Sequence, residues 1–149
     1  MTRRESREAA LKYVFEQEFD AARTPEEIIE TACEERGDEN PSAFARELFF
    51  AVSGHRGDFD EKIAAAADNW RIDRISKVAL AVLRLACAEF YCFPEIPVEI
   101  TVNEALELAR RYADEKSVPF VNGVLGKLAA GLEKPQAKHK PDKAEEQPE

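Results

Sequence analysis

Three arginines lie close together at the start of the chain: Arg3, Arg4 and Arg7. The three-residue step from Arg4 to Arg7 puts two guanidinium groups on one side of a helix. A planar guanidinium binds phosphate oxygens and stacks on bases, which is chemistry suited to single-stranded RNA more than to a duplex groove. Arginine is also common near chain ends, and Glu5 and Glu8 dilute the charge, so an ordinary solvated helix start remains an alternative.

Arg84 and Glu89 interrupt an otherwise apolar stretch from Val78 to Phe90. A charge in such a run is usually paired, or turned toward the one exposed edge of its helix. The functional alternative is that these two side chains belong to a surface that binds a partner protein. The residues themselves leave both interpretations open.

An Asn-Gly pair, Asn122 and Gly123, lies inside the apolar face of the last expected helix. We favour a structural role for it. Glycine lets another helix approach closely, and asparagine can satisfy a neighbouring backbone group.

The remaining polar residues show no catalytic pattern. Glu104, Glu107 and Glu115 lack the arrangement of an enzyme site; we expect Glu107 to pair with Arg111 at i,i+4 and the other two to face water. His55 has no serine, cysteine or acid in the spacing of a nucleophilic triad. A glycine-rich phosphate loop is also missing from the sequence. We therefore expect a binding protein and not an enzyme, with no small-molecule substrate.

The cysteines predict neither a disulfide framework nor a metal centre. The chain has an odd number of cysteines, Cys33, Cys87 and Cys92, and they lack C-x-x-C spacing. The only histidines that could complete a zinc site with them are His55 and His139. We interpret them as reduced thiols and expect no metal or other cofactor.

Length and charge narrow the class further. The 149 residues carry a net charge of −9, which argues against a protein that coats nucleic acid indiscriminately, so any RNA site must be local. No apolar run approaches the roughly 20 residues that span a bilayer, and the charged start lacks a signal peptide's apolar stretch. We expect one cytoplasmic domain over residues 1–132 without membrane attachment.

The spacing of apolar residues predicts helices along that domain. The first runs from Arg3 to Asp20, and Thr24-Pro25 opens a second that ends near Gly37. Asn40-Pro41 should open a third, which the glycines at 54 and 57 should kink or break. A mostly apolar helix follows from Ser76 to Tyr91. Trp70 is a candidate for the core, whereas residues 133–149 have the composition of a disordered tail.

Two amphipathic helices end the domain. The first can begin at Pro97, or at Thr101 with Glu104 as a capping box, and both starts remain possible. Its buried face comprises Val98, Val102, Ala105, Ala109 and Tyr112. Ser117 is a natural N-cap for the second helix, and Gly131 ends it. Its apolar stripe comprises Phe120, Val121, Val124, Leu125 and Leu128.

Three segments together resemble a known family. They are V-N-E-A-L-E-L-A-R-R-Y followed by S-x-x-F-V-N-G-V-L-x-K near the end, R-R-E-S-R-E-A-A-L-K-Y-V-F at 3–15, and V-L-R-L-A-C-A-E-F at 82–90. The pattern resembles the NusB transcription antitermination factors and covers roughly residues 3–131. The resemblance implies an all-α fold, a compact bundle of about seven helices, and favours one long helix through residues 54–57.

The resemblance also implies roles for particular residues. In the family an arginine-rich N-terminal segment contacts the RNA element boxA, which carries over to Arg3, Arg4 and Arg7. Lys127 is placed where it could reach an RNA phosphate. Gly126, just before it, carries an acid in some relatives, and the loss of that acid would remove a repulsion toward RNA.

The family's partner is NusE, a protein of the small ribosomal subunit. Arg84 and Glu89 match the pattern L-R-x-A-x-x-E of the helix that helps to bind NusE, and Asn122 lies near the same surface by resemblance. Arg74 and Lys77 could extend an RNA path, although solvated charges are the simpler interpretation.

The function predicted in this way is transcription antitermination. The protein would bind boxA-type single-stranded RNA of ribosomal transcripts together with NusE, as part of the transcription elongation complex. One alternative is a helical adaptor that binds proteins but not RNA. Another is an accessory RNA-binding domain like those of ribosomal RNA cytosine methyltransferases, which would need a methyl-donor domain downstream.

Overall fold

The computed structural model describes residues 2–36, 42–68 and 74–132, and these residues form seven α-helices and no strand. The helices are α1 (Arg3–Phe19), α2 (Pro25–Arg36), α3 (Ala43–Gly54), α4 (Arg56–Ala66), α5 (Lys77–Cys92), α6 (Val98–Tyr112) and α7 (Ser117–Ala130). The predicted all-α class of about seven helices is confirmed. Trp70 and the predicted tail lie outside the described residues.

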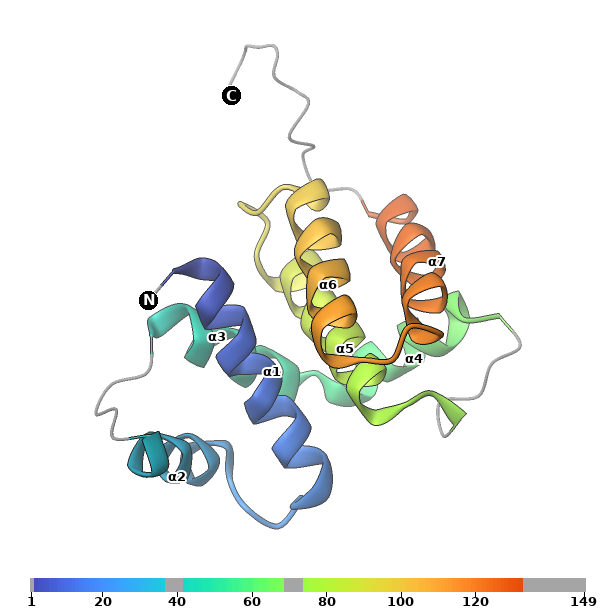
Figure 1. Ribbon diagram of the computed structural model, residues 1–149. Coiled ribbons are helices and arrows are strands. Elements are labelled where there is room, and N and C mark those ends of the chain that lie inside the picture. The colour runs from blue at the N-terminus through green and yellow to red at the C-terminus, as the bar shows by residue number, and fades with distance from the viewer. Residues whose placement is uncertain (1, 37–41, 69–73, 133–149) are drawn as a thin grey trace.

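Helix α5 occupies the centre of the bundle. It packs against α1, α3, α4, α6 and α7 (Figure 1), and every residue from 79 to 90 is buried. A helix that is apolar on most sides can be stable only where neighbours cover all of them. This central helix therefore supplies the common support for the elements that carry candidate site residues.

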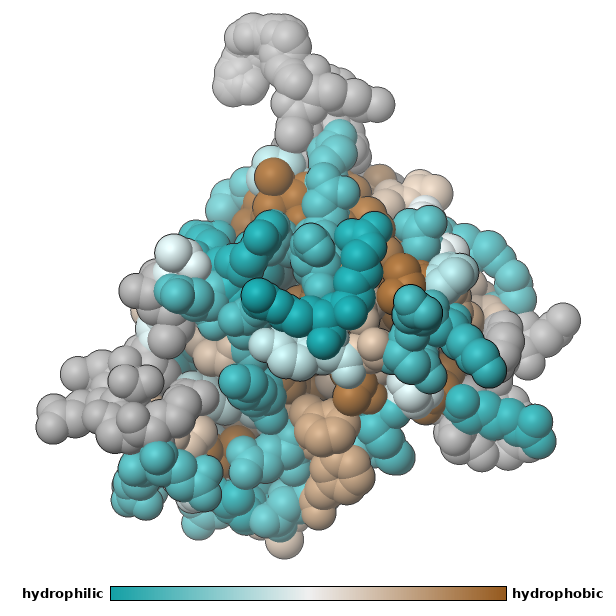
Figure 2. Space-filling model, viewed as in Figure 1, coloured by the Kyte–Doolittle hydropathy of each residue, from teal (hydrophilic) through white to brown (hydrophobic). Residues whose placement is uncertain are grey.

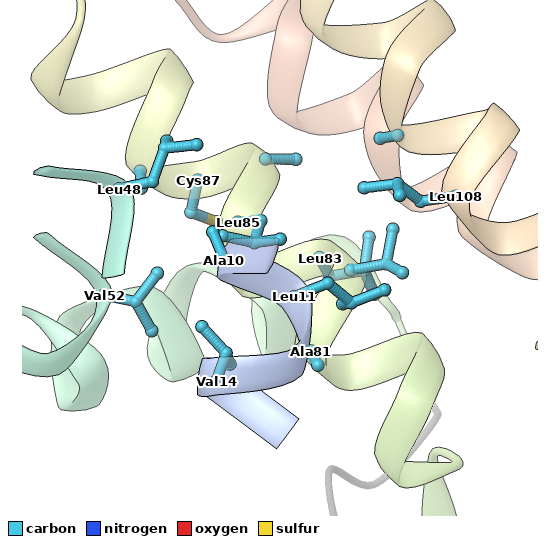
Figure 3. Close-up of a cluster of buried hydrophobic side chains, with 14 of the residues drawn as sticks. Ala10, Leu11, Val14, Leu48, Val52, Ala81, Leu83, Leu85, Cys87 and Leu108 are labelled. Carbon is cyan, nitrogen blue, oxygen red and sulfur yellow. The ribbon is translucent and has the colours of Figure 1, made fainter. Parts of the chain in front are cut away.

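The core between α1, α3 and α5 is built from closely packed aliphatic side chains. Figure 3 shows Leu11 and Val14 projecting from α1, with Leu83 on α5 and with Leu48 and Val52 on α3. Leu48 and Val52 are fully buried. Truncating a buried leucine to alanine costs about 2–5 kcal/mol, so this cluster holds α1 firmly in place.

The helix starts follow local capping rules. Thr2 and Glu5 form a capping box at α1, and Thr24 and Glu27 exchange the same two hydrogen bonds at α2. The predicted starts of both helices are confirmed. The third helix, α3, has Ser42 as its cap, whose side chain accepts a hydrogen bond from the Ala45 amide. The predicted start at Asn40-Pro41 lies outside the described residues.

The predicted break between residues 54 and 57 is also confirmed. His55 has φ −124° and ψ 21°, which ends α3 at Gly54 and lets α4 begin at Arg56. The single long helix that the resemblance favoured is therefore wrong.

The starts of α6 and α7 differ in part from the expected ones. Pro97 precedes α6, and the alternative capping box is wrong because the Thr101 hydroxyl is buried and donates to Glu89. Ser117 is not the cap of α7; the Asp114 carboxylate accepts hydrogen bonds from the Ser117 amide and hydroxyl. That bonding lowers the pKa of Asp114.

The remaining expectations for this region are mostly met. Tyr112, assigned to the buried face of α6, is instead exposed at 39%. The predicted stripe of α7 is buried except for Phe120, which is partly buried. Gly131 ends α7 as predicted.

Three structural facts bear on the other expectations. The three cysteines are free thiols, as predicted, and burial raises the pKa of Cys87 to about 12. Within the described ranges no helix is long and apolar enough to cross a membrane. The same residues contain no group of three or more His, Cys, Asp or Glu side chains placed to hold a metal ion.

Candidate RNA and partner interface

The first turn of α1 exposes two of the predicted arginines. Arg3 lies over the ring of Phe44, with its guanidinium carbon 3.9 Å from the ring centroid. Arg4 binds Glu104 of α6 through two hydrogen bonds, Nε to Oε1 at 3.1 Å and Nη2 to Oε2 at 2.9 Å. Both guanidinium groups can be reached from solvent, which is the first requirement for contact with RNA.

Arg7 occupies a different environment from Arg4, although the two share a side of α1. It is 5% exposed and binds Glu89 of α5 through Nε at 2.6 Å and Nη2 at 3.0 Å. The Thr101 hydroxyl donates to the same carboxylate at 2.7 Å. A buried charge pair with this many hydrogen bonds fixes α1 against α5 and α6 and leaves Arg7 no free face for a ligand.

Arg4 and Glu104, which we call the outer pair, both stay charged at neutral pH. The hydrogen bonds from Arg4 lower the pKa of Glu104, and the same contact raises the pKa of Arg4. Glu104 was expected to face water, and this expectation is wrong because it bridges α6 to the start of α1.

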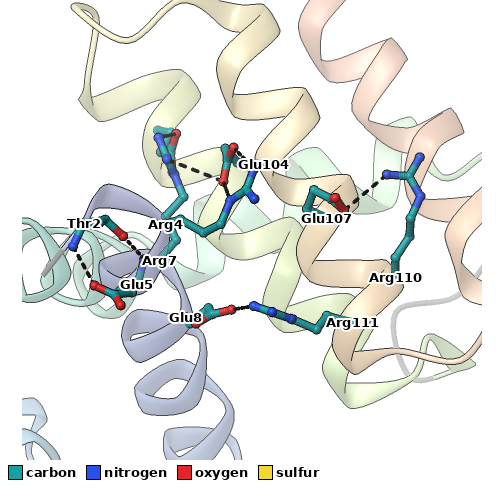
Figure 4. A network of polar contacts seen from close by, with 10 residues as sticks. Thr2, Arg4, Glu5, Arg7, Glu8, Glu104, Glu107, Arg110 and Arg111 are labelled. Atoms are coloured by element: carbon teal, nitrogen blue, oxygen red, sulfur yellow. Dashed lines mark hydrogen bonds and ion pairs between the residues drawn. The ribbon is translucent and has the colours of Figure 1, made fainter.

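Two further arginines approach the same surface from the end of α6. Arg111 forms an ion pair with Glu8 of α1, and Arg110 lies 3.7 Å from Glu107 (Figure 4). The expected pair between Glu107 and Arg111 is therefore wrong, since Arg111 reaches across to another helix. The sequence signal was two adjacent arginines in the last turn of a helix, where cations are favoured.

These side chains surround a hollow of about 250 Å³ between α1 and α6. We call it the seam hollow. Its lining comprises Arg4, Glu8, Glu104, Glu107, Leu108, Arg110 and Arg111.

Arg84 is buried, and two carboxylates surround it. Its Nε and Nη2 donate to Asp60 at 2.8 and 3.0 Å, and its Nη1 donates to Glu18 at 2.7 Å. Burial opposes its charge, but the hydrogen bonds that Arg84 donates to these two acids outweigh burial and raise the pKa of Arg84. Lys77 and Arg56 also bind Glu18. Arg84 thus joins α1, α4 and α5.

Arg84 and Glu89 together attach both ends of α1 to the central helix. Glu89 holds Arg7 near the start of α1, and Arg84 holds Glu18 near its end. The alternative that both charges are paired inside the fold is therefore confirmed.

The two candidate residues on α7 are exposed. The Asn122 side chain has no hydrogen-bond partner within the described ranges, and Lys127 forms an ion pair with Asp68. Our structural interpretation of Gly123 is wrong: a Cβ added there would meet nothing within 4 Å, so no helix approaches it closely. The α6 helix lies between α1 and α7, so the structure does not bring Lys127 to the N-terminal arginines (Figure 1).

An apolar groove that the sequence did not indicate lies beside the C-terminal half of α1. Its volume is about 780 Å³. Phe15 and Phe19 stack edge to face with centroids 4.9 Å apart, and Phe19 is 64% exposed. Val78 and Tyr112 line the groove from α5 and the end of α6. Figure 2 shows apolar side chains at the surface over this end of α1.

We call this feature the α1 groove. A contiguous apolar surface of this kind is a candidate docking site for a protein. The signal available in the sequence was the four-residue step from Phe15 to Phe19, which puts both rings on one side of a helix.

Comparison with known proteins identifies the family. The model of the NusB family matches residues 4–130. The chain belongs to the NusB family. The transcription antitermination protein NusB of Myxococcus xanthus is 41% identical over 137 residues, which cover 89% of this chain and 98% of that protein.

Solved NusB structures share the fold. A structure of T. maritima NusB superposes with a TM-score of 0.80 at 34% identity and covers 89% of this chain and 93% of that one. A structure of the antitermination factors NusB and NusE in complex with double-stranded RNA gives a TM-score of 0.75 at 26% identity, with coverage of 89% and 100%. The predicted family and fold are thus confirmed.

Within this NusB-family fold the predicted site residues fall into two groups. The exposed residues are Arg3, Arg4, Asn122 and Lys127, and the buried residues are Arg7, Arg84 and Glu89. Only the first group presents atoms that a ligand can touch without rearrangement of the core.

Proposed function

We propose that this NusB-family protein is a transcription antitermination factor that binds boxA-type RNA of ribosomal transcripts together with NusE. Relatives over most of the chain carry the antitermination name, and a similar solved structure contains NusB, NusE and RNA. The protein would act in the cytoplasm, by binding and without catalysis, as part of the transcription elongation complex.

The exposed arginine pair at the start of α1 carries the RNA part of this proposal. Arg3 and Arg4 supply guanidinium groups for phosphates and bases, while Arg7 acts as a positioning residue because it fixes the turn that presents them. Lys127 provides a separate cation on α7 that an extended RNA could reach.

The α1 groove carries the partner part. NusE would place an apolar segment against Phe15 and Phe19, because this exposed surface gains most from being covered. Arg84 and Glu89 would affect NusE binding indirectly, since they hold the helix that forms the groove. Asn122 could add a polar contact from α7.

The proposed mechanism is additive. The protein's net charge of −9 and its few free cations make its own RNA affinity low. A partner that touches the same RNA raises the affinity of the joined pair without a new kind of contact.

A fluorescence-anisotropy titration of a short boxA-type RNA tests the proposal, with and without the organism's own NusE, across a salt series. We expect tighter binding with NusE and a salt slope that corresponds to about two to four phosphates. Duplex RNA of the same sequence serves as a second ligand, because we expect preference for the single strand.

The variant Arg3→Ala/Arg4→Ala assigns the site. We expect it to lose at least about tenfold in RNA affinity, since each charge-assisted contact to phosphate contributes more than a neutral hydrogen bond. Arg46→Ala/Lys62→Ala removes two charges from α3 and α4 and serves as the control. Association with NusE but no RNA binding by the wild-type pair would instead identify the chain as a protein adaptor.

A further inference from the structure

The seam hollow contains three arginines that the proposed function has used only in part. Arg4, Arg110 and Arg111 are 58%, 58% and 61% exposed at their side chains. They come from two helices far apart in sequence and project around one hollow (Figure 4). Such convergence of guanidinium groups is the arrangement that phosphate recognition requires.

Each of these arginines already has a carboxylate partner, so a phosphate must exchange with that carboxylate. Arg110 lies 3.7 Å from Glu107, whose side chain is 48% exposed. An exposed ion pair at this separation is screened by water and salt and contributes little. The exchange should therefore be easy at Arg110, whereas the buried pair of Arg7 with Glu89 cannot exchange without exposing a charge.

The pair of Arg111 with Glu8 is intermediate. Arg111 is largely exposed, while the Glu8 side chain is 20% exposed on α1. Arg111 can rotate outward and keep its charge hydrated, because its position at the end of α6 faces solvent. A phosphate offers the Arg111 guanidinium two oxygens, as the Glu8 carboxylate does. The charge of the phosphate belongs to the ligand, and no other contact within the fold depends on it.

The location of the hollow connects it to the proposed RNA surface. Arg4 belongs both to the hollow and to the exposed pair at the start of α1. The helical rise places residues 104 and 111 of α6 about 10 Å apart along the helix axis. A strand bound at Arg4 can thus continue along α6 to its last turn.

We propose that the seam hollow is a phosphodiester-binding site, in which RNA backbone phosphates replace Glu107 on Arg110 and Glu8 on Arg111. The inference rests on the proposed function and deepens it by naming a second part of the RNA surface. Glu8 and Glu107 then act as internal competitors that keep the RNA affinity of the free protein low. The partner-bound state overcomes this competition because its RNA is held at more points.

The decisive measurement compares charge-matched variants in the anisotropy assay with boxA-type RNA and NusE. Glu8→Gln/Glu107→Gln removes both competitors, and we expect RNA affinity to rise about fivefold, beyond the rise produced by Glu47→Gln/Glu61→Gln. Those control acids are exposed on α3 and α4 and have no ion pair within the described ranges.

Arg110→Ala/Arg111→Ala tests the arginines directly. We expect a loss of about tenfold or more in affinity and a decrease of about 1.4 in the salt slope, which corresponds to two lost single-strand phosphate contacts. Arg46→Ala/Lys62→Ala should leave the slope nearly unchanged. Thermal unfolding by circular dichroism and the affinity for NusE verify that the variant retains its fold.

The possible failures are distinguishable. If the wild-type pair binds RNA but the Arg110/Arg111 variant keeps the affinity and salt slope of the control, the seam site is wrong and the proposed function stands. If removal of Glu8 and Glu107 charges has no more effect than the control, the competition is wrong. If neither the protein nor the pair binds RNA, the proposed function is overturned and the seam site with it.

Discussion

Arg4 and Arg7 show how three residues of separation can give one residue type two different roles. Arg4 is mostly exposed and pairs with Glu104 at the surface, so a ligand can reach its guanidinium group. Arg7 and Glu89 are both almost fully buried, and Thr101 adds a hydrogen bond to the carboxylate. Removing one member of such a pair leaves the other charge without compensation in the core.

Glu89→Leu should therefore reduce the free energy of unfolding by about 3–5 kcal/mol, because Arg7 would lose both of its hydrogen bonds to Glu89 and keep only the looser ion pair of its Nη1 with Glu104 Oε1, at 3.9 Å. Adding Arg7→Met should recover most of this loss, since an apolar pair of similar volume needs no compensation. Urea unfolding of the two variants measures the difference. A loss below about 1 kcal/mol for Glu89→Leu alone would show that water or the neighbouring Glu104 compensates the charge of Arg7.

The α1 helix is the element on which both proposed surfaces depend. Its start presents Arg3 and Arg4, and its end presents Phe15 and Phe19. Two ion pairs of opposite polarity attach it to α5, one near each end. Because α1 is rigidly attached, less conformational entropy is lost when a partner binds to it. The buried ion pairs can therefore support affinity without touching a ligand.

A groove variant separates binding from stability at this element. Phe19→Ser should leave the unfolding free energy within about 0.5 kcal/mol, because the ring is 64% exposed. It should weaken NusE association about tenfold if the groove is the docking surface. Isothermal titration calorimetry measures this affinity. Ile100→Ser, at an exposed apolar residue near the other end of α6, is the matched control, and equal effects of both variants would contradict the assignment.

Local signals predicted the elements well and their mutual contacts poorly. Thr24-Pro25 and the glycines around His55 fixed real boundaries, because capping and backbone entropy act within a few residues. The start of α6 could not be decided between Pro97 and Thr101, because the Thr101 hydroxyl bonds Glu89, which lies on another helix. Arg111 was misread for the same reason, since its partner is Glu8 on α1. Single-sequence spacing contains no information about which helix packs beside which.

At the scale of the whole molecule, the acidic surplus and the ion pairs across helices determine how the protein responds to pH. The chain has 30 acidic and 21 basic side chains. Glu18 forms ion pairs with Arg84, Lys77 and Arg56. Burial opposes the ionisation of Glu18, but the hydrogen bonds from Arg84 and Lys77 outweigh burial and lower its pKa. The hydrogen bonds from Arg4 likewise lower the pKa of Glu104.

A carboxyl whose pKa is lower in the folded state stabilises the fold above its unfolded pKa, and loses that contribution as pH falls through the folded value. Since the unperturbed pKa of both acids is 4.5, we expect stability to be nearly constant from pH 7 to about 5 and to fall below about pH 4.5. Glu18→Gln/Glu104→Gln should be less stable at pH 7 but lose less on acidification, because two of the responsible protons no longer bind.

Urea midpoints at pH 7, 5 and 3.5 measure this dependence, with Glu47→Gln/Glu61→Gln as a control for the change in net charge. Raising the salt concentration should reduce the contribution of the outer pair between Glu104 and Arg4 more than that of Glu18, whose partner Arg84 is buried. Parallel pH curves for the wild type and the Glu18/Glu104 variant would mean that other carboxylates control the acid transition.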